Sequence, residues 1–209
     1  MSGLKRVSFF IDGFNVYHNL KDDSRYHKFL WLDYRKLSEY YIKSDEIIAD
    51  IFYFTALAKQ RGEKVVKRHR DYIAALKFMG VETVLGRFKK KERKCKLCKS
   101  WYTGNEEKKT DVNLSLRLFV EAYKNTYDKA FIVTNDTDMV PAVEAVKNEF
   151  SDKEIGVLVP FGCKEPTKEL KTVCDLQVKI FKKAVRESQL PDVLKVSDKY
   201  TVIRPKGYS

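Results

Sequence analysis

Short apolar runs that alternate with amphipathic stretches are the feature of this 209-residue chain that most constrains its fold. Such runs predict strands at 7–11, 47–57, 81–88, 130–134 and 155–159, with a short sixth at 173–176. The stretches between them predict helices at 33–43, 63–79, 110–123, 138–148 and 177–185. Strands that alternate with helices form parallel sheets, so we expect an α/β fold with a mostly parallel sheet and helices on both faces.

Two segments fall outside this rhythm. Residues 89–104, KKKERKCKLCKSWYTG, are strongly basic and are expected to form an inserted loop or small knuckle outside the core. The tail after residue 189 contains two prolines and is expected to be extended or loosely ordered. The domain therefore spans residues 1–185, with the insertion at about 89–104 and a C-terminal extension at 186–209.

No apolar run is long enough to span a bilayer, and the first run stops too early for a secretory signal. We therefore expect a cytoplasmic protein without a membrane partner.

The charge of the chain points to a polyanionic partner. Lys and Arg number 41 against 29 Asp and Glu, a formal net charge of +12. Such an excess attracts nucleic acid, although Lys-rich surfaces also serve solubility alone. The expected nucleic-acid contacts fall in two clusters: Lys64, Lys67, Arg68 and Arg70, and then Lys89, Lys90, Lys91, Arg93 and Lys94. Trp101 and Tyr102, beside the second cluster, could stack on unpaired bases or pack the insertion onto the domain.

Acidic side chains follow the predicted strands. Asp12 ends the first strand, Asp136 and Asp138 follow the fourth, and Asp111 opens a helix. In a parallel sheet these places share the carboxyl edge, where ligands bind. Gathered carboxylates repel one another unless a cation is bound, and Mg²⁺ or Mn²⁺ suits such oxygen ligands. Each aspartate also has an alternative explanation, as a turn residue or a helix cap.

Three motifs resemble those of the NYN domain family. They are FFIDGFNVYHNL near the start, EEKKTDVNLSLRL in the middle and FIVTNDTDMVPAV further on, in the family's order. NYN domains are relatives of PIN domains, so the resemblance implies a Rossmann-like, PIN-like three-layer fold with an acidic site for Mg²⁺ or Mn²⁺. It implies catalytic roles for Asp12, Asn15, Asp111, Asp136 and Asp138, with the four aspartates as metal ligands.

Two further residues have supporting roles under this resemblance. Thr134 is expected to orient the segment that carries Asp136. Glu107 lies one helical turn before Asp111 and would face the site if that helix began early; otherwise it is a solvent-facing charge.

The function that we expect is hydrolysis of RNA by a metal-dependent ribonuclease. RNA is the expected partner, with single-stranded DNA as the alternative. A catalytically silent nucleic-acid-binding regulator and a small-phosphoester hydrolase remain as alternatives. The chain lacks a G-x-x-x-x-G-K-[ST] phosphate loop. The three histidines form no nucleophile-and-base arrangement, although His18 could contact a phosphate.

The CxxC pair suggests a second metal site, separate from the acidic one. Cys95 and Cys98 have the spacing of a zinc knuckle, but structural zinc normally takes four ligands. Within one chain Cys163, Cys174 or His69 could complete the set. In a homodimer a second CxxC would do so without them.

Overall fold

The computed structural model describes residues 3–208 and confirms the α/β fold. Six parallel strands form the central sheet in the order β3-β2-β1-β6-β7-β8. They are Lys5–Asp12 (β1), Glu46–Thr55 (β2), Glu82–Leu85 (β3), Lys129–Val133 (β6), Glu154–Val159 (β7) and Leu176–Lys179 (β8). The strand order reverses direction between β1 and β6, and such a switch point is where open α/β sheets bind ligands.

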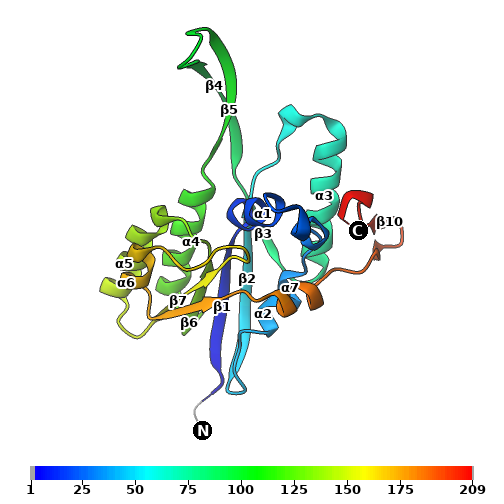
Figure 1. The fold of residues 1–209 in the computed structure, drawn as a ribbon. Helices are drawn as coiled ribbons and strands as arrows, with labels where there is room; N and C mark the ends of the chain where they lie inside the picture. The colour runs from blue at the N-terminus through cyan, green and yellow to red at the C-terminus, as the bar shows by residue number, and fades with distance from the viewer. Residues whose placement is uncertain (1–2, 209) are drawn as a thin grey trace.

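Helices cover both faces of this sheet (Figure 1). The α-helices are Gly13–Lys21 (α1), Tyr34–Glu39 (α2), Glu63–Phe78 (α3), Thr110–Tyr123 (α4), Val140–Glu149 (α5), Lys168–Val173 (α6) and Lys182–Glu187 (α7). Four 3-10 turns complete the helical set, at Ser24–Phe29 (η1), Lys59–Arg61 (η2), Thr137–Met139 (η3) and Lys206–Tyr208 (η4).

Alternation along the central strands produces two cores. In β1, Phe9 and Ile11 pack with side chains of α1, α2, α3 and α7, whereas Phe10 packs with those of α4, α5 and α6. β6 divides in the same way, with Phe131 on the first side and Ile132 on the second. Because side chains of a strand alternate between faces, such all-apolar strands need both faces covered, which fixes the three layers.

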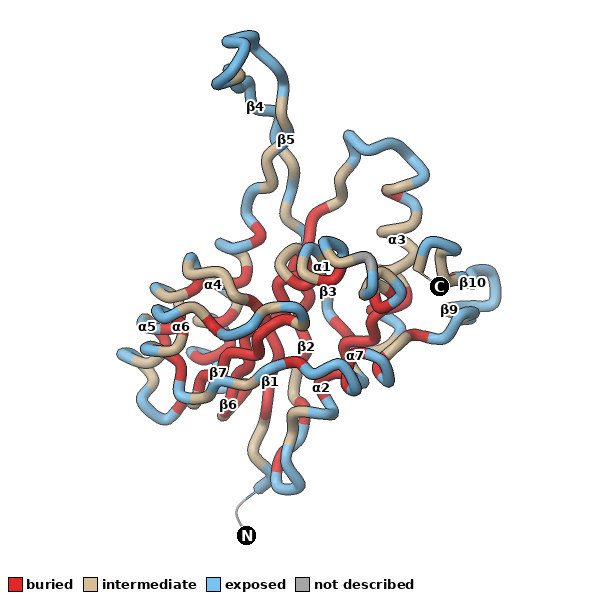
Figure 2. Tube along the Cα trace, viewed as in Figure 1, coloured by how far each residue is buried: buried red, intermediate tan, exposed pale blue. Residues whose placement is uncertain are grey.

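Two hairpins extend this plan. The predicted inserted loop at 89–104 is instead part of an antiparallel hairpin of Arg87–Lys94 (β4) and Trp101–Lys108 (β5), which we call the arm. The arm stands away from the body, and most of its residues are exposed (Figures 1 and 2). The strand predicted at 81–88 is thus divided between β3 in the sheet and the start of the arm.

The C-terminal tail is not loosely ordered. Its strands Val193–Ser197 (β9) and Tyr200–Ile203 (β10) form a second hairpin, which contacts α3. Leu190 and Val202 are buried in the first core, and the indole N–H of Trp31 donates to the Pro191 carbonyl at 3.0 Å.

Local predictions were wrong in three other places. The sixth strand predicted at 173–176 begins only at Leu176, because Val173 is the last residue of α6. The helix predicted at 177–185 is the edge strand β8 followed by α7, because Leu176 and Val178 alternate with polar residues on a half-covered strand. Helix α1 was not predicted, since glycine and two asparagines favour helices poorly. Its first turn is instead stabilised by a side-chain cap from Asp12.

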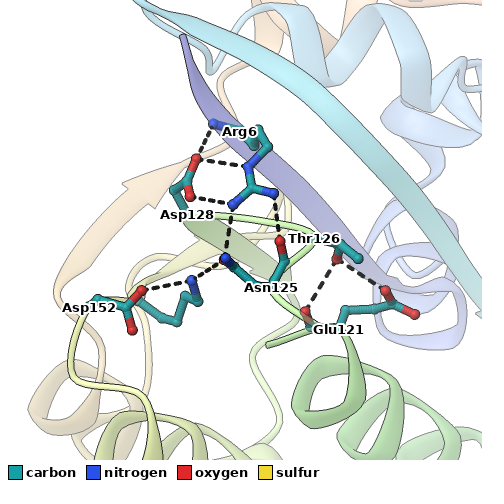
Figure 3. A network of polar contacts seen from close by, with 7 residues as sticks. Arg6, Glu121, Asn125, Thr126, Asp128 and Asp152 are labelled. Carbon is teal, nitrogen blue, oxygen red and sulfur yellow. Dashed lines mark hydrogen bonds and ion pairs between the residues drawn. The ribbon is translucent and has the colours of Figure 1, made fainter. Parts of the chain in front are cut away.

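The amino-terminal edge of the sheet is held by paired charges (Figure 3). The Arg6 guanidinium donates to both carboxylate oxygens of Asp128, at 3.1 and 2.7 Å, and to Asn125. The hydrogen bond from Arg6 lowers the pKa of Asp128 to about 2. No helix among residues 3–208 is long and apolar enough to cross a membrane.

Candidate functional site

Asp12 lies at the last position of β1, beside the switch point of the sheet. One carboxylate oxygen accepts the backbone N–H groups of Phe14 and Asn15, at 3.1 and 3.0 Å, and so caps α1. A Cβ at Gly13 would approach the Tyr53 ring and the Phe54 carbonyl within 2.7 Å, so only glycine lets α1 start this close to β2. Asp12, whose alternative explanation was a turn, is thus the N-cap of α1.

Thr134 connects the carboxylates that follow β1 and β6. Its hydroxyl donates to the second oxygen of Asp12 at 3.0 Å and accepts the backbone N–H of Asp136 at 3.1 Å. Asp136 in turn caps η3 by accepting the N–H of Asp138 at 3.0 Å. One buried hydroxyl thus connects the Asp12 carboxylate with the backbone of Asp136.

Asp111 and Glu107 come from α4 and β5. Asp111 lies in the first turn of α4. Glu107 is not on an extended helix, as the sequence suggested, but near the end of β5, where it accepts hydrogen bonds from the backbone and hydroxyl of Thr110. A Cβ on Gly86 would lie 2.5 Å from the Thr110 hydroxyl and 2.7 Å from Glu107, so the root of the arm packs tightly against these residues.

These side chains open into one cavity of about 480 Å³, which we call the central cavity. Asp12, Glu107, Asp111 and Asp136 all line it and are called the carboxylate cluster. Asn15 lines it too, and its side-chain oxygen accepts the Asn135 backbone N–H at 3.2 Å. Asp138 is exposed and does not line the cavity.

The electrostatics of the cluster are those of crowded, partly desolvated acids. Burial raises the pKa of Asp12 to about 6 against the opposing hydrogen bonds from Asn15 and Thr134, and the charges of Asp111 and Asp136 raise it further. Removal from water also raises the pKa of Asp111, followed by the charges of Glu107, Asp136 and Asp138. The charges that raise these two pKa values are all negative, so a cation would relieve the repulsion.

The donor set fits a hard divalent cation in its chemistry. Four carboxylates converge on one cavity, and Mg²⁺ or Mn²⁺ prefers such ligands. Across residues 3–208, however, no three His, Cys, Asp or Glu side chains are grouped closely enough to hold an ion by themselves. An ion here would therefore keep several waters, as Mg²⁺ usually does, with only part of the cluster in direct contact.

The predicted basic residues separate into those at the cavity and those far from it. Of the α3 cluster only Arg68 lines the cavity, whereas Lys64, Lys67 and Arg70 are exposed on the helix. In the arm, Lys89, Lys90, Lys91, Arg93 and Lys94 are all exposed. Glu106 pairs with Lys91 at 3.1 Å and lies 3.9 Å from Arg93.

Of the three aromatic residues of the arm, Phe88 packs at its root against Phe14 of α1, with ring centres 5.8 Å apart. Trp101 and Tyr102 do not pack the arm onto the domain. Trp101 is 69% exposed and Tyr102 is 51% exposed. The Lys94 ammonium lies 6.0 Å from the centre of the Trp101 ring. These rings are accessible for stacking.

Cys95 and Cys98 lie at the tip of the arm. The turn between the strands is closed by bonds from the Cys95 N–H to the Ser100 carbonyl and from the Lys99 N–H to the Cys95 carbonyl. The hydrogen bond with Ser100 lowers the pKa of the Cys98 thiol to about 7. Cys163 instead donates to Asn19, and Cys174 is buried in the core, so within residues 3–208 neither completes a metal site with the pair.

Several cavity residues have no counterpart among the predicted site residues. They are chiefly aromatic or cationic: Phe14, Tyr17, Tyr53, Arg61, His69, Tyr72, Phe88 and Tyr208. Thr55 also lines the cavity, and it ends β2 at the same carboxyl edge as Asp12. The edge rule that selected Asp12 would have selected Thr55, whereas no local pattern points to Tyr208.

Comparison with known families settles the relationship of the chain. The NYN domain family matches residues 6–181, which is most of the sequence and contains both the sheet and the carboxylate cluster. The chain belongs to the NYN domain family. A nuclease-like fold is thereby established for it.

Individual relatives are more distant. The chain is 29% identical to 6-hydroxy-3-succinoylpyridine 3-monooxygenase HspA of Pseudomonas putida, over 74% of this chain and 59% of that protein. This NYN chain thus spans about three fifths of the length of that relative. A crystal structure of a protein of unknown function from Vibrio parahaemolyticus superposes with a TM-score of 0.60 at 18% identity, over 87% of this chain and 96% of that one. That likeness supports the fold alone.

Proposed function

We propose that this NYN protein is a metal-dependent ribonuclease that hydrolyses phosphodiester bonds at the carboxylate cluster. The observation that carries the proposal is that acids from separate elements line one cavity at the switch point of the sheet. Their raised pKa values reflect burial and mutual repulsion, which a divalent cation would relieve.

The protein's own part in the reaction is to position groups. Thr134 bonds to the Asp12 carboxylate and to the Asp136 backbone, and the Thr110 N–H bonds to the Glu107 carboxylate. A bound Mg²⁺ or Mn²⁺ would polarise the phosphoryl oxygens and lower the pKa of a bound water. Asp138 would act through its charge on Asp111 and its backbone bond to Asp136.

The cationic side chains supply attraction for an RNA backbone. An acidic cluster repels phosphate, and exposed lysines of the arm and of α3 offset that repulsion. The exposed rings of Trp101 and Tyr102 favour unpaired bases, so we expect cleavage within single-stranded RNA or loops, in the cytoplasm.

Incubation of the purified protein with labelled RNA and DNA tests this function. We expect RNA fragments with Mg²⁺ or Mn²⁺ and none with chelator. Binding without cleavage under every metal condition would instead indicate a silent RNA-binding regulator. Hydrolysis of p-nitrophenyl phosphate without RNA cleavage would indicate a small-phosphoester hydrolase.

A second function is favoured by a specific observation. The central cavity is rich in aromatic side chains, and the relative from Pseudomonas putida is named as a monooxygenase of a pyridine compound. Oxygenation of a small heteroaromatic acid is therefore the second candidate. Oxygen uptake with 6-hydroxy-3-succinoylpyridine and an electron donor, in the absence of RNA cleavage, would replace the nuclease proposal with this one.

A further inference from the structure

The central cavity extends well beyond the carboxylate cluster. Its other walls come from β2, α1, α3 and the C-terminal turn η4, and they carry Tyr53, Tyr17, Tyr72 and Tyr208. A metal site needs only the acidic end of this space. A volume of about 480 Å³ lies within the range of small-molecule sites, which pair apolar walls with a few fixed polar groups.

The aromatic wall is rigid and already formed. Tyr53 and Tyr72 meet edge to face with ring centres 6.1 Å apart, and Tyr72 packs on the buried Trp31 at 5.4 Å. The Tyr72 hydroxyl donates to the Leu32 carbonyl at 2.7 Å, which fixes its ring. Rings held in place by such packing present flat apolar surface with little loss of entropy on binding.

The polar groups on the same wall are neutral. His69 Nε2 lies 3.2 Å from the Thr55 hydroxyl, and burial lowers the pKa of this histidine to about 4. A neutral imidazole offers a hydrogen-bond donor or acceptor to the edge of a planar ring, whereas an imidazolium would offer donors alone.

Cationic side chains also line the cavity. Arg61 and Arg68 line it, and Arg68 lies 5.3 Å from the centre of the Tyr208 ring. Guanidinium groups bind phosphate and carboxylate in a planar, two-pronged manner. A ligand that packs on the aromatic wall must be flat. To bond with the neutral His69 it needs nitrogens or oxygens on its ring, and to bind the guanidinium groups it needs an anionic group.

We propose that the aromatic end of the central cavity binds one planar heteroaromatic ring bearing an anionic group, which Tyr208 covers from the C-terminal extension. The inference deepens the proposed function by naming what the site holds. Two sources share this chemistry: one unstacked nucleotide of an RNA chain, and a free pyridine-type acid.

Calorimetric titration of the full chain tests the site with three probes. Uridine 5′-monophosphate carries ring and anion, ribose 5-phosphate carries the anion alone, and 6-hydroxy-3-succinoylpyridine carries a ring and a carboxylate without ribose. We expect at least one ring-bearing probe to bind about tenfold more tightly than ribose 5-phosphate, as stacking of one base usually contributes. The tighter of the two ring-bearing probes identifies the source.

Variants show whether binding occurs in this cavity. Tyr208→Ala should weaken the ring-bearing probe about tenfold, and Arg68→Gln should weaken both phosphates. Tyr123→Ala is the matched control, because Tyr123 lies 75% exposed on α4 and does not line the cavity. Tyr208 is in the last turn, so its removal leaves the sheet intact, and circular dichroism checks this.

The outcomes separate this inference from the nuclease proposal. Equal affinity for ribose 5-phosphate and the ring-bearing probes, or no effect of Tyr208→Ala, would overturn the inference even if RNA were cleaved. If the protein binds the ring-bearing probes but cleaves no RNA with any metal, the inference would stand and the nuclease proposal would be rejected.

Discussion

The two ends of the parallel sheet treat their aspartates in opposite ways. At the amino end Asp128 is met by the Arg6 guanidinium, and its pKa falls to about 2. At the carboxyl end Asp12 is buried among other acids, and its pKa rises to about 6. Paired charges stabilise a fold, whereas crowded and unpaired ones are costly and typical of binding sites. The contrast separates an aspartate whose charge is paired within the fold from one whose charge is not.

The largest expected effect comes from neutralising one aspartate at each end. Asp12→Asn should reduce metal-dependent RNA cleavage by more than about 100-fold, because even partners behind metal ligands usually contribute 10–100-fold. Asp128→Asn should leave the cleavage rate within about twofold while lowering the melting temperature. Equal loss of activity in both variants would show that the difference between the ends has no functional meaning.

The pH dependence should also differ between the ends, and its sign follows from the pKa of Asp12. The folded value of about 6 lies above the ordinary 3.8, so the folded state binds this proton more tightly than the unfolded chain. The free energy of unfolding should therefore fall as pH rises from about 4 to 6, by up to about 3 kcal/mol from this group.

Asp12→Asn removes the loss of stability that ionisation of Asp12 causes, and its side-chain oxygen can still cap α1. In chelator at pH 7.5 the variant should melt at a higher temperature than wild type, and at pH 4 the difference should vanish. At low metal concentration, the rate of RNA cleavage by the wild-type protein should increase roughly tenfold for each unit that the pH rises toward 6, because Asp12 must lose its proton to bind the metal. Above pH 6 the rate should level off. A variant less stable than wild type at pH 7.5 would contradict the buried, unpaired state of Asp12.

Substitutions in the arm should change the affinity for RNA more than the rate of cleavage. Lys89→Gln with Lys90→Gln should weaken RNA binding and flatten its salt dependence, by roughly 0.7 to 0.9 in log–log slope for each phosphate that is no longer neutralised. The control is Lys182→Gln with Lys183→Gln, two exposed charges on α7 at the body. Filter binding at several salt concentrations compares them, and equal slopes in the two double variants would place the RNA elsewhere.

The smallest effect on cleavage is expected at the tip of the arm. Since Cys95 and Cys98 find no third ligand among the described residues, we expect zinc, as a homodimer-bridging Cys₄ site, at one ion per two chains. Elemental analysis and sedimentation of wild type and Cys95→Ser/Cys98→Ser measure this. The double variant should be a zinc-free monomer that cleaves at a near-normal rate, and one zinc per chain in wild type would contradict the shared site.

Much of the fold and part of the site could be predicted from sequence. The five apolar strands and the acids at their ends follow from hydrophobic pattern and the carboxyl-edge rule, and Asp12 and Asp136 are where that rule puts them. The arm was missed as a hairpin because its strands are exposed on both faces and carry no alternation. Tyr208 and His69 reach the cavity only through tertiary packing, which no local pattern reports.

The arm has a further property that follows from its pairing. β4 and β5 match residue for residue from Arg87–Lys108 at the root to Lys94–Trp101 near the tip. At about 3.4 Å per residue, the paired part of the arm is roughly 25 Å long. Glu107 of the carboxylate cluster lies in the second pair from the root, and Trp101 lies six residues away on the same strand, at about 20 Å. Insertion of two residues in each strand would lengthen the arm by about 7 Å and keep every side chain on the same face of the hairpin. If RNA binds at Trp101 and is cleaved at the carboxylate cluster, as we propose, the number of residue pairs in the arm would set the distance between the two places.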